Sequence, residues 1–218
     1  MSSESAVAKK TPYVTYAVIG LCVLVYLWEL MNFQTVEEMV ALARLKGGLW
    51  MGLTAFAATF VHSQNPLHIV FNLMAFSVLG RLIETIYGPF RLALVVIALA
   101  WVASTLQAEF GGFGVGLSGV VYGIFGIMIG ASPSSPFLWW FVKKNAVNLI
   151  GWAVICVVLS QTGTLAIGNW AHFGGLFYGA ICGLIYGLPR YRYGFIGLAV
   201  LIPIILFVML PGPQTSEG

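Results

Sequence analysis

The sequence predicts an all-α polytopic membrane protein, and three observations lead to this class. Of the 218 residues, 60% are hydrophobic and only 8% are charged, and the mean hydropathy is +0.95. Soluble domains carry about 25% charged residues, so this chain has too few charges to cover a surface that faces water. The apolar residues also form long runs, and Lys and Arg gather in the connections between alternate runs.

Seven apolar runs predict transmembrane helices, since most of them approach the roughly 20 residues needed to cross a bilayer. Lys9 and Lys10 precede the first run, which is long enough, and lacks a cleavage site, to be retained instead of removed as a signal peptide. Pro66 suits the first turn of the second helix. The helices are expected at residues 13–31, 66–84, 90–108, 117–131, 145–161, 169–187 and 194–210.

These helices are expected to form one membrane core with an extension at each end. A polar N-terminal tail at 1–12, expected to be disordered, precedes a six-helix core at 13–188. The seventh helix and a short C-terminal tail follow at 189–218.

Two segments between the spans are expected at the membrane surface. The long outer loop at 32–64 contains a possible surface helix at 35–45 and an apolar, glycine-interrupted stretch around Trp50. Tryptophan favours the headgroup level, so this stretch is expected in the interface. The aromatic patch at 137–142, before the fifth span, is expected there too.

The distribution of basic residues predicts the orientation. With the N-terminus inside, the outer segments would hold only Arg44 and Lys46 of the ten Lys and Arg residues. The positive-inside rule therefore places the N-terminus in the cytoplasm. This topology fits a bacterial cytoplasmic membrane, although composition leaves a eukaryotic secretory membrane open.

A glycine-dense turn from Gly111 leads into the fourth span, with Ser118 at the join. Small residues along an apolar helix usually serve close packing, and that interpretation stays open for the turn alone. However, the span at 117–131 has only about 15 of the roughly 20 residues needed. The turn must then lie below the outer surface, where irregular backbone is tolerated only inside protein or beside a wet cavity.

Three chemical groups are expected at matching depth near the outer surface. The second, fourth and sixth spans all run inward, and they carry His68, Ser118 and His172 near their starts. A serine and a histidine can act as nucleophile and general base. The chain has no Asp, and three of its carboxylates, Glu29, Glu84 and Glu109, fall at span ends. A Ser118–His172 dyad is therefore expected, with Tyr122 orienting the imidazole.

Acyl transfer also needs donors for an oxyanion, and the sequence offers three. Asn72 lies four residues after His68, hence on the same helix face. The backbone N–H of Ser118 is the third donor, since the first amides of a helix lack internal partners. Gly116 and Gly119 would let a substrate backbone approach. The alternatives are that Asn72 joins helices and that each histidine serves packing or an ion path.

Other features have simpler interpretations. Gly175, Gly179 and Gly183 recur at helical spacing, which predicts that the sixth span packs closely, against the fourth for example. Glu84 is expected to be a structural hydrogen-bonding residue, and His62 in the outer loop has no assigned role. The three cysteines show neither disulfide nor metal spacing, so no metal or cofactor is expected.

Four motifs together resemble the rhomboid intramembrane serine proteases across about residues 50–188. They are His68-Ile-Val-Phe-Asn72, Glu84-Thr-Ile-Tyr-Gly88, Gly116-Leu-Ser-Gly119 with Tyr122, and Ala171-His172-Phe-Gly-Gly175 with Gly179. The resemblance implies a six-helix core around a water-filled cavity that opens outward. It also implies Ser118 as nucleophile, His172 as general base, and an oxyanion site from Asn72, His68 and the Ser118 amide.

The resemblance further implies partners. Transmembrane protein substrates would be cut in or near their spans within the lipid bilayer, and no nucleic acid is expected. The fifth span and the loop Gln161–Gly168 resemble the lateral gate and cap of the family, and the seventh helix matches its six-plus-one type. Two residues depart from many relatives. Met51 follows Trp50 where they carry Arg, and Val115 stands where they carry Gly.

Two other functions compete with a protease. A non-catalytic rhomboid-like scaffold would bind membrane protein clients, but such relatives usually lack the serine or the histidine. A transporter or channel would need polar residues through the full depth of several helices. The inner halves of the second, fourth and sixth spans are nearly all apolar, which disfavours such a path.

Overall fold

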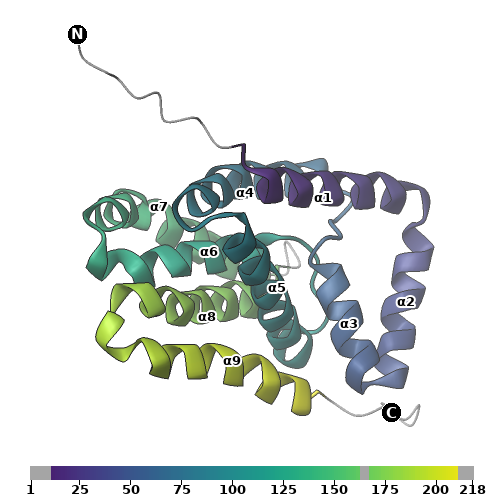
Figure 1. Ribbon diagram of the computed structural model, residues 1–218. Coiled ribbons are helices and arrows are strands. Elements are labelled where there is room, and N and C mark those ends of the chain that lie inside the picture. The colour runs from purple at the N-terminus through teal and green to yellow at the C-terminus, as the bar shows by residue number, and fades with distance from the viewer. Residues whose placement is uncertain (1–10, 163–166, 211–218) are drawn as a thin grey trace.

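The computed structural model describes residues 11–162 and 167–210 as a bundle of helices (Figure 1). No strand occurs in the part of the chain that it describes. The tail at 1–10, the middle of the cap loop at 163–166 and the C-terminal tail at 211–218 lie outside the described residues, as do the predictions made for them. The helices are α1 (Tyr13–Met31), α2 (Phe33–Lys46), α3 (Gly48–Ala58), α4 (Pro66–Tyr87), α5 (Pro89–Gly111), α6 (Ser118–Ala131), α7 (Pro136–Gln161), α8 (Asn169–Gly187) and α9 (Arg192–Val208), with single 3₁₀ turns at Ser132–Ser134 and Pro189–Tyr191.

The predicted fold class is confirmed, and each of the seven expected spans is a helix. Five described helical segments are long and apolar enough to cross a membrane by length and composition: α1, α4, α5, α7 and the segment Pro189–Val208 that contains α9. α6 is a shorter apolar helix, as expected, and most of its residues are buried. The chain is thus a multi-pass membrane protein with α6 at its centre.

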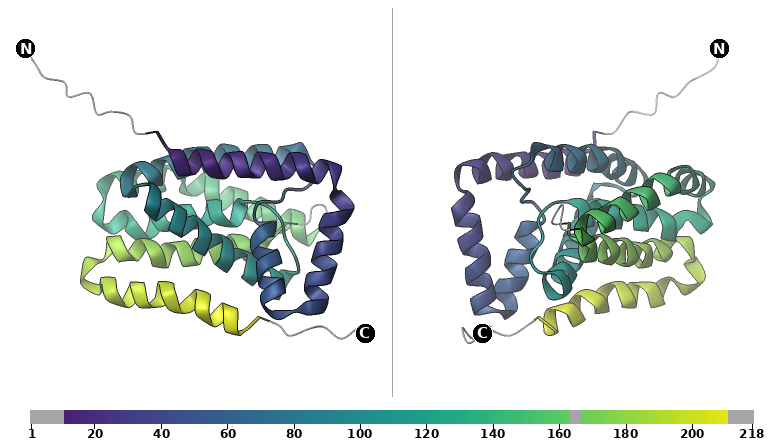
Figure 2. Two further views of the ribbon diagram at one scale, coloured as in Figure 1. Left: turned by 45° about the vertical axis from the view of Figure 1, so that its right-hand side comes forward. Right: turned by 180° about the vertical axis from the view of Figure 1, so that it is seen from behind.

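The helices around α6 differ in how far they are covered. Figure 1 shows α6 between α4, α5, α7 and α8, while α9 runs along the edge of the bundle beside α8. No residue of α9 is buried. The Tyr178 hydroxyl donates to the carbonyl oxygen of Ala199 at 2.8 Å and so ties α9 to α8. α2 and α3 stand together at one side of the molecule, with α3 against α5 (Figure 2).

Local sequence signals explain where the helices begin and end. Asn65 caps α4 by accepting the Leu67 amide, and Pro66 occupies the first turn, where its missing N–H costs nothing. Gly88, at φ 88°, separates α4 from α5 in a backbone conformation that only glycine adopts easily. Ser135 and Pro136 begin α7 in the same way as Asn65 and Pro66 begin α4.

Two expectations about the surface segments need correction. The outer loop at 32–64 contains two helices, α2 and α3, which are separated only at Gly47, φ 61°, so the glycines within α3 do not interrupt it. The aromatic patch at 137–142 is not a separate interfacial segment. It forms the first turns of α7, since nothing after Pro136 interrupts the helix before Gln161.

The closest helix pair is α6 and α8, and glycine makes it possible. A Cβ at Gly175 would overlap the carbonyl oxygen of Gly119 across the interface, and a Cβ at Gly179 would overlap that of Gly123. Gly183 lies against α6 at Ile127 in the same way. The predicted packing stripe is confirmed. Its consequence is that the start of α8 is held next to the start of α6.

A buried carboxylate joins the start of α1 to the end of α4. Glu84 accepts hydrogen bonds from the amides of Val14 and Thr15 at 3.0 and 2.9 Å, and from the Thr15 hydroxyl at 2.7 Å. These bonds satisfy two of the amides that a helix start leaves unpaired. The structural role expected for Glu84 is confirmed.

Candidate active site

The glycine-rich turn is held from two sides before it enters α6. The amide of Gly116 donates to the Ala58 carbonyl oxygen at the end of α3, at 3.1 Å. Gln107 on α5 donates to the Gly112 carbonyl oxygen at 3.3 Å. Gly116 has φ 110°, and a Cβ there would lie 2.8 Å from the His68 ring. Only glycine therefore combines this backbone with this approach to His68.

Ser118 and His172 are in hydrogen-bond contact. Ser118 is the first residue of α6, His172 lies in the first turn of α8, and the Ser118 Oγ is 2.8 Å from the His172 Nε2. His172 is 5% exposed. At this distance the hydroxyl can donate to an unprotonated Nε2, which is the geometry of a nucleophile beside its base.

The imidazole of His172 is supported by an aromatic ring. The ring of Tyr122 stacks on it with centroids 4.4 Å apart and planes inclined by 9°. Tyr122 is 3% exposed, and its hydroxyl has no hydrogen-bond partner among the described residues. No carboxylate hydrogen-bonds to His172 in the described part of the chain. The contact of Tyr122 is thus through its ring face, in the place expected for it.

His68 and Asn72 lie on the other side of the glycine-rich turn. The His68 Nδ1 accepts the backbone N–H of Ser63 at 3.1 Å, and the side-chain amide of Asn72 donates to the His68 carbonyl oxygen at 2.8 Å. The position of a Cβ on Gly116 would be 2.8 Å from the His68 Nε2 and 3.7 Å from the Asn72 Nδ2. Both side-chain donors therefore face the turn that precedes Ser118.

Gly119 has a different neighbourhood from Gly116. Its missing Cβ would lie 2.7 Å from the Ala103 Cβ on α5 and 3.2 Å from the Ala171 carbonyl oxygen on α8. Because Gly119 has no side chain, α5 and α8 can both pack closely against α6 at this position. Its backbone also lines a small cavity beside Ser118.

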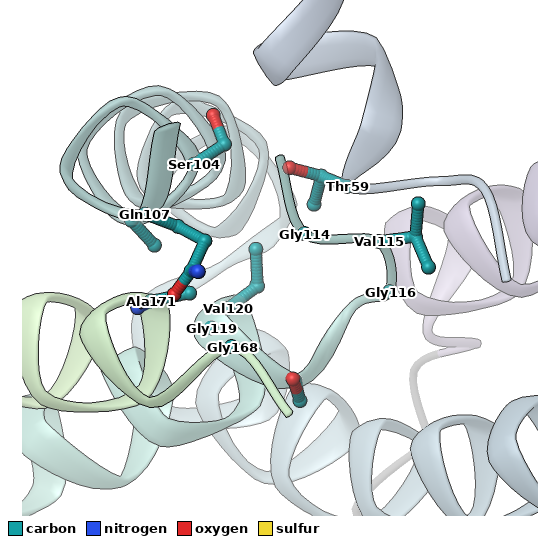
Figure 3. Close-up of a pocket in the computed structure, with 12 residues that line it drawn as sticks. Thr59, Ser104, Gln107, Gly114, Val115, Gly116, Gly119, Val120, Gly168 and Ala171 are labelled. Carbon is teal, nitrogen blue, oxygen red and sulfur yellow. Dashed lines mark hydrogen bonds between the residues drawn. The ribbon is translucent and has the colours of Figure 1, made fainter. Parts of the chain in front are cut away.

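That cavity has a polar wall that sequence reasoning missed. Figure 3 shows its lining residues, including Thr59, Ser104 and Gln107, around the turn at Gly114–Gly116. The Gln107 side chain reaches from α5 towards α8, where its Oε1 accepts the Ala171 amide at 3.2 Å (Figure 3). The sequence did hold one indication of this role: Gln107 is a polar residue near the end of an otherwise apolar span, and such residues are often functional. The structure shows that it is buried.

A second missed group lies behind His68. His62 is completely buried, its ring centroid is 5.3 Å from that of His68, and its Nδ1 lies 3.2 Å from the Phe60 carbonyl oxygen. Glu29, near the end of α1, accepts the His62 amide at 3.1 Å and is itself buried. The sequence predicted no role at the site for either residue, because His62 lies in a loop and Glu29 lies at the end of a span.

The helix that carries Met51, α3, is anchored by apolar contact. Met51 is 5% exposed and clusters with Ala55 and Ala108, with Phe113 packed against them. The guanidinium of Arg44 lies over the Phe113 ring, 5.4 Å from its centroid. Trp50 is exposed, which suits the interfacial position expected for it.

The fold is that of a helical membrane protein, and its site places a serine hydroxyl against a histidine ring. The Rhomboid domain model matches residues 46–189, well over half of the chain. The chain therefore belongs to the rhomboid family, and relatives named rhomboid protease give its enzyme class, a serine endopeptidase of the membrane.

Curated relatives support the same family. The chain is 27% identical to rhomboid protease GlpG of Haemophilus influenzae over 177 aligned residues. The alignment covers 79% of the chain and 90% of that protein. It is 32% identical to rhomboid protease GlpG of Salmonella choleraesuis over 76% of the chain and 60% of that protein. Rhomboid protease GluP of Bacillus subtilis is 26% identical over 96% of the chain and 42% of its own length.

Proposed function

We propose that this protein is an intramembrane serine endopeptidase that hydrolyses peptide bonds in or near transmembrane segments, with Ser118 as nucleophile and His172 as general base. The observation that carries the proposal is the 2.8 Å contact between the Ser118 Oγ and the His172 Nε2. Family membership and the names of the relatives support the reaction class.

In the first half of the reaction, the Ser118 Oγ attacks the scissile carbonyl carbon while its proton passes to the His172 Nε2. The carbonyl oxygen becomes an oxyanion, for which His68, Asn72 and the Ser118 amide are the proposed donors. The carbon–nitrogen bond then breaks as His172 returns the proton to the leaving amine, and an ester to Ser118 remains.

In the second half, His172 takes a proton from water as the water oxygen attacks the ester. The ester bond then breaks, and the proton returns to the Ser118 Oγ. Tyr122 keeps the imidazole plane in place through both halves by stacking on it. The polar wall of Gln107, Ser104 and Thr59 makes the space beside Ser118 suitable for that water.

The setting of the reaction is part of the proposal. We place the N-terminus in the cytoplasm, the active site towards the outer side, and the protein in a bacterial cytoplasmic membrane, on the distribution of Lys and Arg. The catalytic core would comprise residues 13–188, flanked by the tail at 1–12 and the segment at 189–218. Transmembrane proteins in the surrounding lipid bilayer are the proposed substrates. Their backbone would approach Ser118 at Gly116 and Gly119, which have no side chains.

A fluorophosphonate probe tests the nucleophile directly. We expect it to label the wild-type protein in liposomes but neither Ser118→Ala nor His172→Ala, because the hydroxyl is reactive only when the imidazole accepts its proton. Both variants should also lose cleavage of a transmembrane reporter by at least about 10⁴-fold.

Ser77→Ala is the matched control, since Ser77 lies on α4 and its hydroxyl donates to the Met74 carbonyl oxygen. It should label and cleave normally. Cleavage retained by Ser118→Ala would contradict the proposed nucleophile. A wild-type protein that binds reporters without labelling or cutting would favour the scaffold function instead.

A further inference from the structure

The segment between α3 and α4 is held by α1 at two points. Near the end of α1, the Glu29 carboxylate accepts the backbone N–H of His62 at 3.1 Å. One turn earlier, the Tyr26 hydroxyl donates to the Gln64 carbonyl oxygen at 3.3 Å. Ser63 lies between these two contacts. Glu29 is only 3% exposed, and a buried carboxylate is tolerated only with hydrogen-bond donors, so its bond to His62 is a strong constraint on the segment.

The amide of Ser63 sets the protonation of the His68 ring. It donates to the His68 Nδ1 at 3.1 Å, and a ring nitrogen can accept only when it carries no proton. The neutral ring must then hold its proton on Nε2. This is the nitrogen that faces Gly116, where a Cβ would be 2.8 Å away.

The other tautomer would be useless to an oxyanion. With its proton on Nδ1, the ring would direct that N–H at the Ser63 N–H, and its Nε2 would be an acceptor beside the turn that precedes Ser118. Two donors would then face each other, and a developing negative charge would meet a lone pair. The backbone N–H of Ser63 therefore determines whether His68 can donate.

We propose that Glu29 is a positioning residue for catalysis: by holding the His62–Gln64 segment, it keeps the Ser63 amide on the His68 Nδ1 and so keeps the His68 proton on Nε2, ready for the oxyanion. This inference rests on the proposed function, because it needs His68 as an oxyanion donor. It assigns a role to a carboxylate on α1 that touches neither Ser118 nor His172.

Nitrogen NMR of histidine tests the tautomer without any substrate. The chain has 3 histidines, so ¹⁵N-histidine labelling in lipid bilayers gives a simple spectrum, and His68→Ala assigns the His68 signals. At neutral pH the wild-type His68 should show a protonated Nε2 and an unprotonated Nδ1. Glu29→Ala should give a mixture of the two tautomers.

Three further variants separate positioning from folding. Glu29→Gln keeps a side-chain oxygen for the His62 amide, so it should restore the wild-type spectrum. Thr15→Val removes the hydroxyl bond to Glu84 at the other end of α1 and should leave the His68 tautomer unchanged. Tyr26→Phe, which loses only the weaker contact to Gln64, should shift the tautomers in the same direction as Glu29→Ala but less.

Reporter cleavage then connects the tautomer to catalysis. Glu29→Ala should lower kcat by up to about 10²-fold, the lower end of the range for losing one oxyanion donor, with KM little changed. An unchanged His68 spectrum in Glu29→Ala would overturn the inference. A shifted spectrum with unchanged kcat would overturn the link to catalysis. A wild type that cleaves nothing would refute the proposed function, while the spectra would still decide whether Glu29 sets the tautomer.

Discussion

At the scale of single residues, the site depends on one glycine and one imidazole that approach each other closely. Gly116 combines φ 110° with a backbone so near His68 that a Cβ would be 2.8 Å from the ring. The positive φ favours glycine by itself, and the contact with His68 leaves no room for a side chain. Together they explain why the turn before Ser118 has no side chain at this position.

The requirement for glycine at position 116 can be tested by adding one methyl group. Gly116→Ala should lower kcat by about 10²-fold, because the new Cβ displaces the His68 ring from the oxyanion site. Gly112→Ala is the matched control. Gly112 also has a positive φ, 74°, but its Cβ would have only the Arg44 guanidinium within 4 Å, at 3.9 Å. Equal losses of kcat in the two variants would show that backbone strain, and not contact with His68, is responsible.

The roles proposed for several residues depend on contacts with partners that are distant in sequence. Ser118 and His172 are 54 positions apart, and Glu29 and His62 are 33 apart. Motif spacing suggested the first pair, because each residue sits in its own small-residue motif. Nothing in the local sequence of Glu29 suggested its bond to a loop amide. The role of Met51 was likewise hidden, since its burial depends on α5.

At the scale of elements, the pair of α6 and α8 carries the site. Both helices present glycines to each other, and α6 is buried on nearly every side. The turn before α6 is exposed at Gly111, Gly112 and Val115, while its later part lines a small cavity beside Ser118. The short fourth span is confirmed as a short helix beside a cavity, and its start below the membrane surface stays a prediction.

Substitution within this pair should destabilise the protein. Gly179→Ala would put a Cβ onto the Gly123 carbonyl oxygen, and we expect it to lower the free energy of unfolding by about 1–3 kcal/mol, as overpacking does. Gly197→Ala on α9 is the control, since no heavy atom lies within 4 Å of its Cβ position and alanine favours a helix by up to about 1 kcal/mol. Thermal unfolding in detergent micelles measures both. A Gly179→Ala variant as stable as Gly197→Ala would show that α6 and α8 can separate without cost.

At the scale of the whole molecule, stability should depend on pH through His62, which lies in the connection between α3 and α4. Burial, and to a lesser extent the neighbouring His68, lowers the pKa of His62 from 6.5 to about 4, although its contact with the Phe60 carbonyl opposes this. The unfolded chain therefore binds the His62 proton more readily than the folded one between these two values. Stability is then complete above about pH 6.5 and falls as the pH drops towards 4.

The loss attributable to His62 should reach about 3 kcal/mol near pH 4, from a pKa difference of about 2.5. Unfolding measured in micelles between pH 4 and pH 7 checks this. His62→Gln, which does not titrate there, should make the profile less steep. Thr15→Val, which keeps His62 but removes the hydroxyl bond to the Glu84 carboxylate at the far end of α1, should retain the loss of stability that His62 causes. An equally steep profile in His62→Gln would assign the pH dependence to another group.

The chain alone was enough to predict the all-helical membrane fold, a helix at each of the seven apolar runs and the family, because composition, run length, breaking residues and short motifs can be read locally. It also placed Ser118, His172, His68 and Asn72 at the same ends of their helices, and their catalytic roles stay predictions. Whether two such ends touch depends on how whole helices pack. For that reason only the tertiary structure revealed the 2.8 Å Ser118–His172 contact, the Ser63 amide on His68 and the hold of Glu29 on that loop.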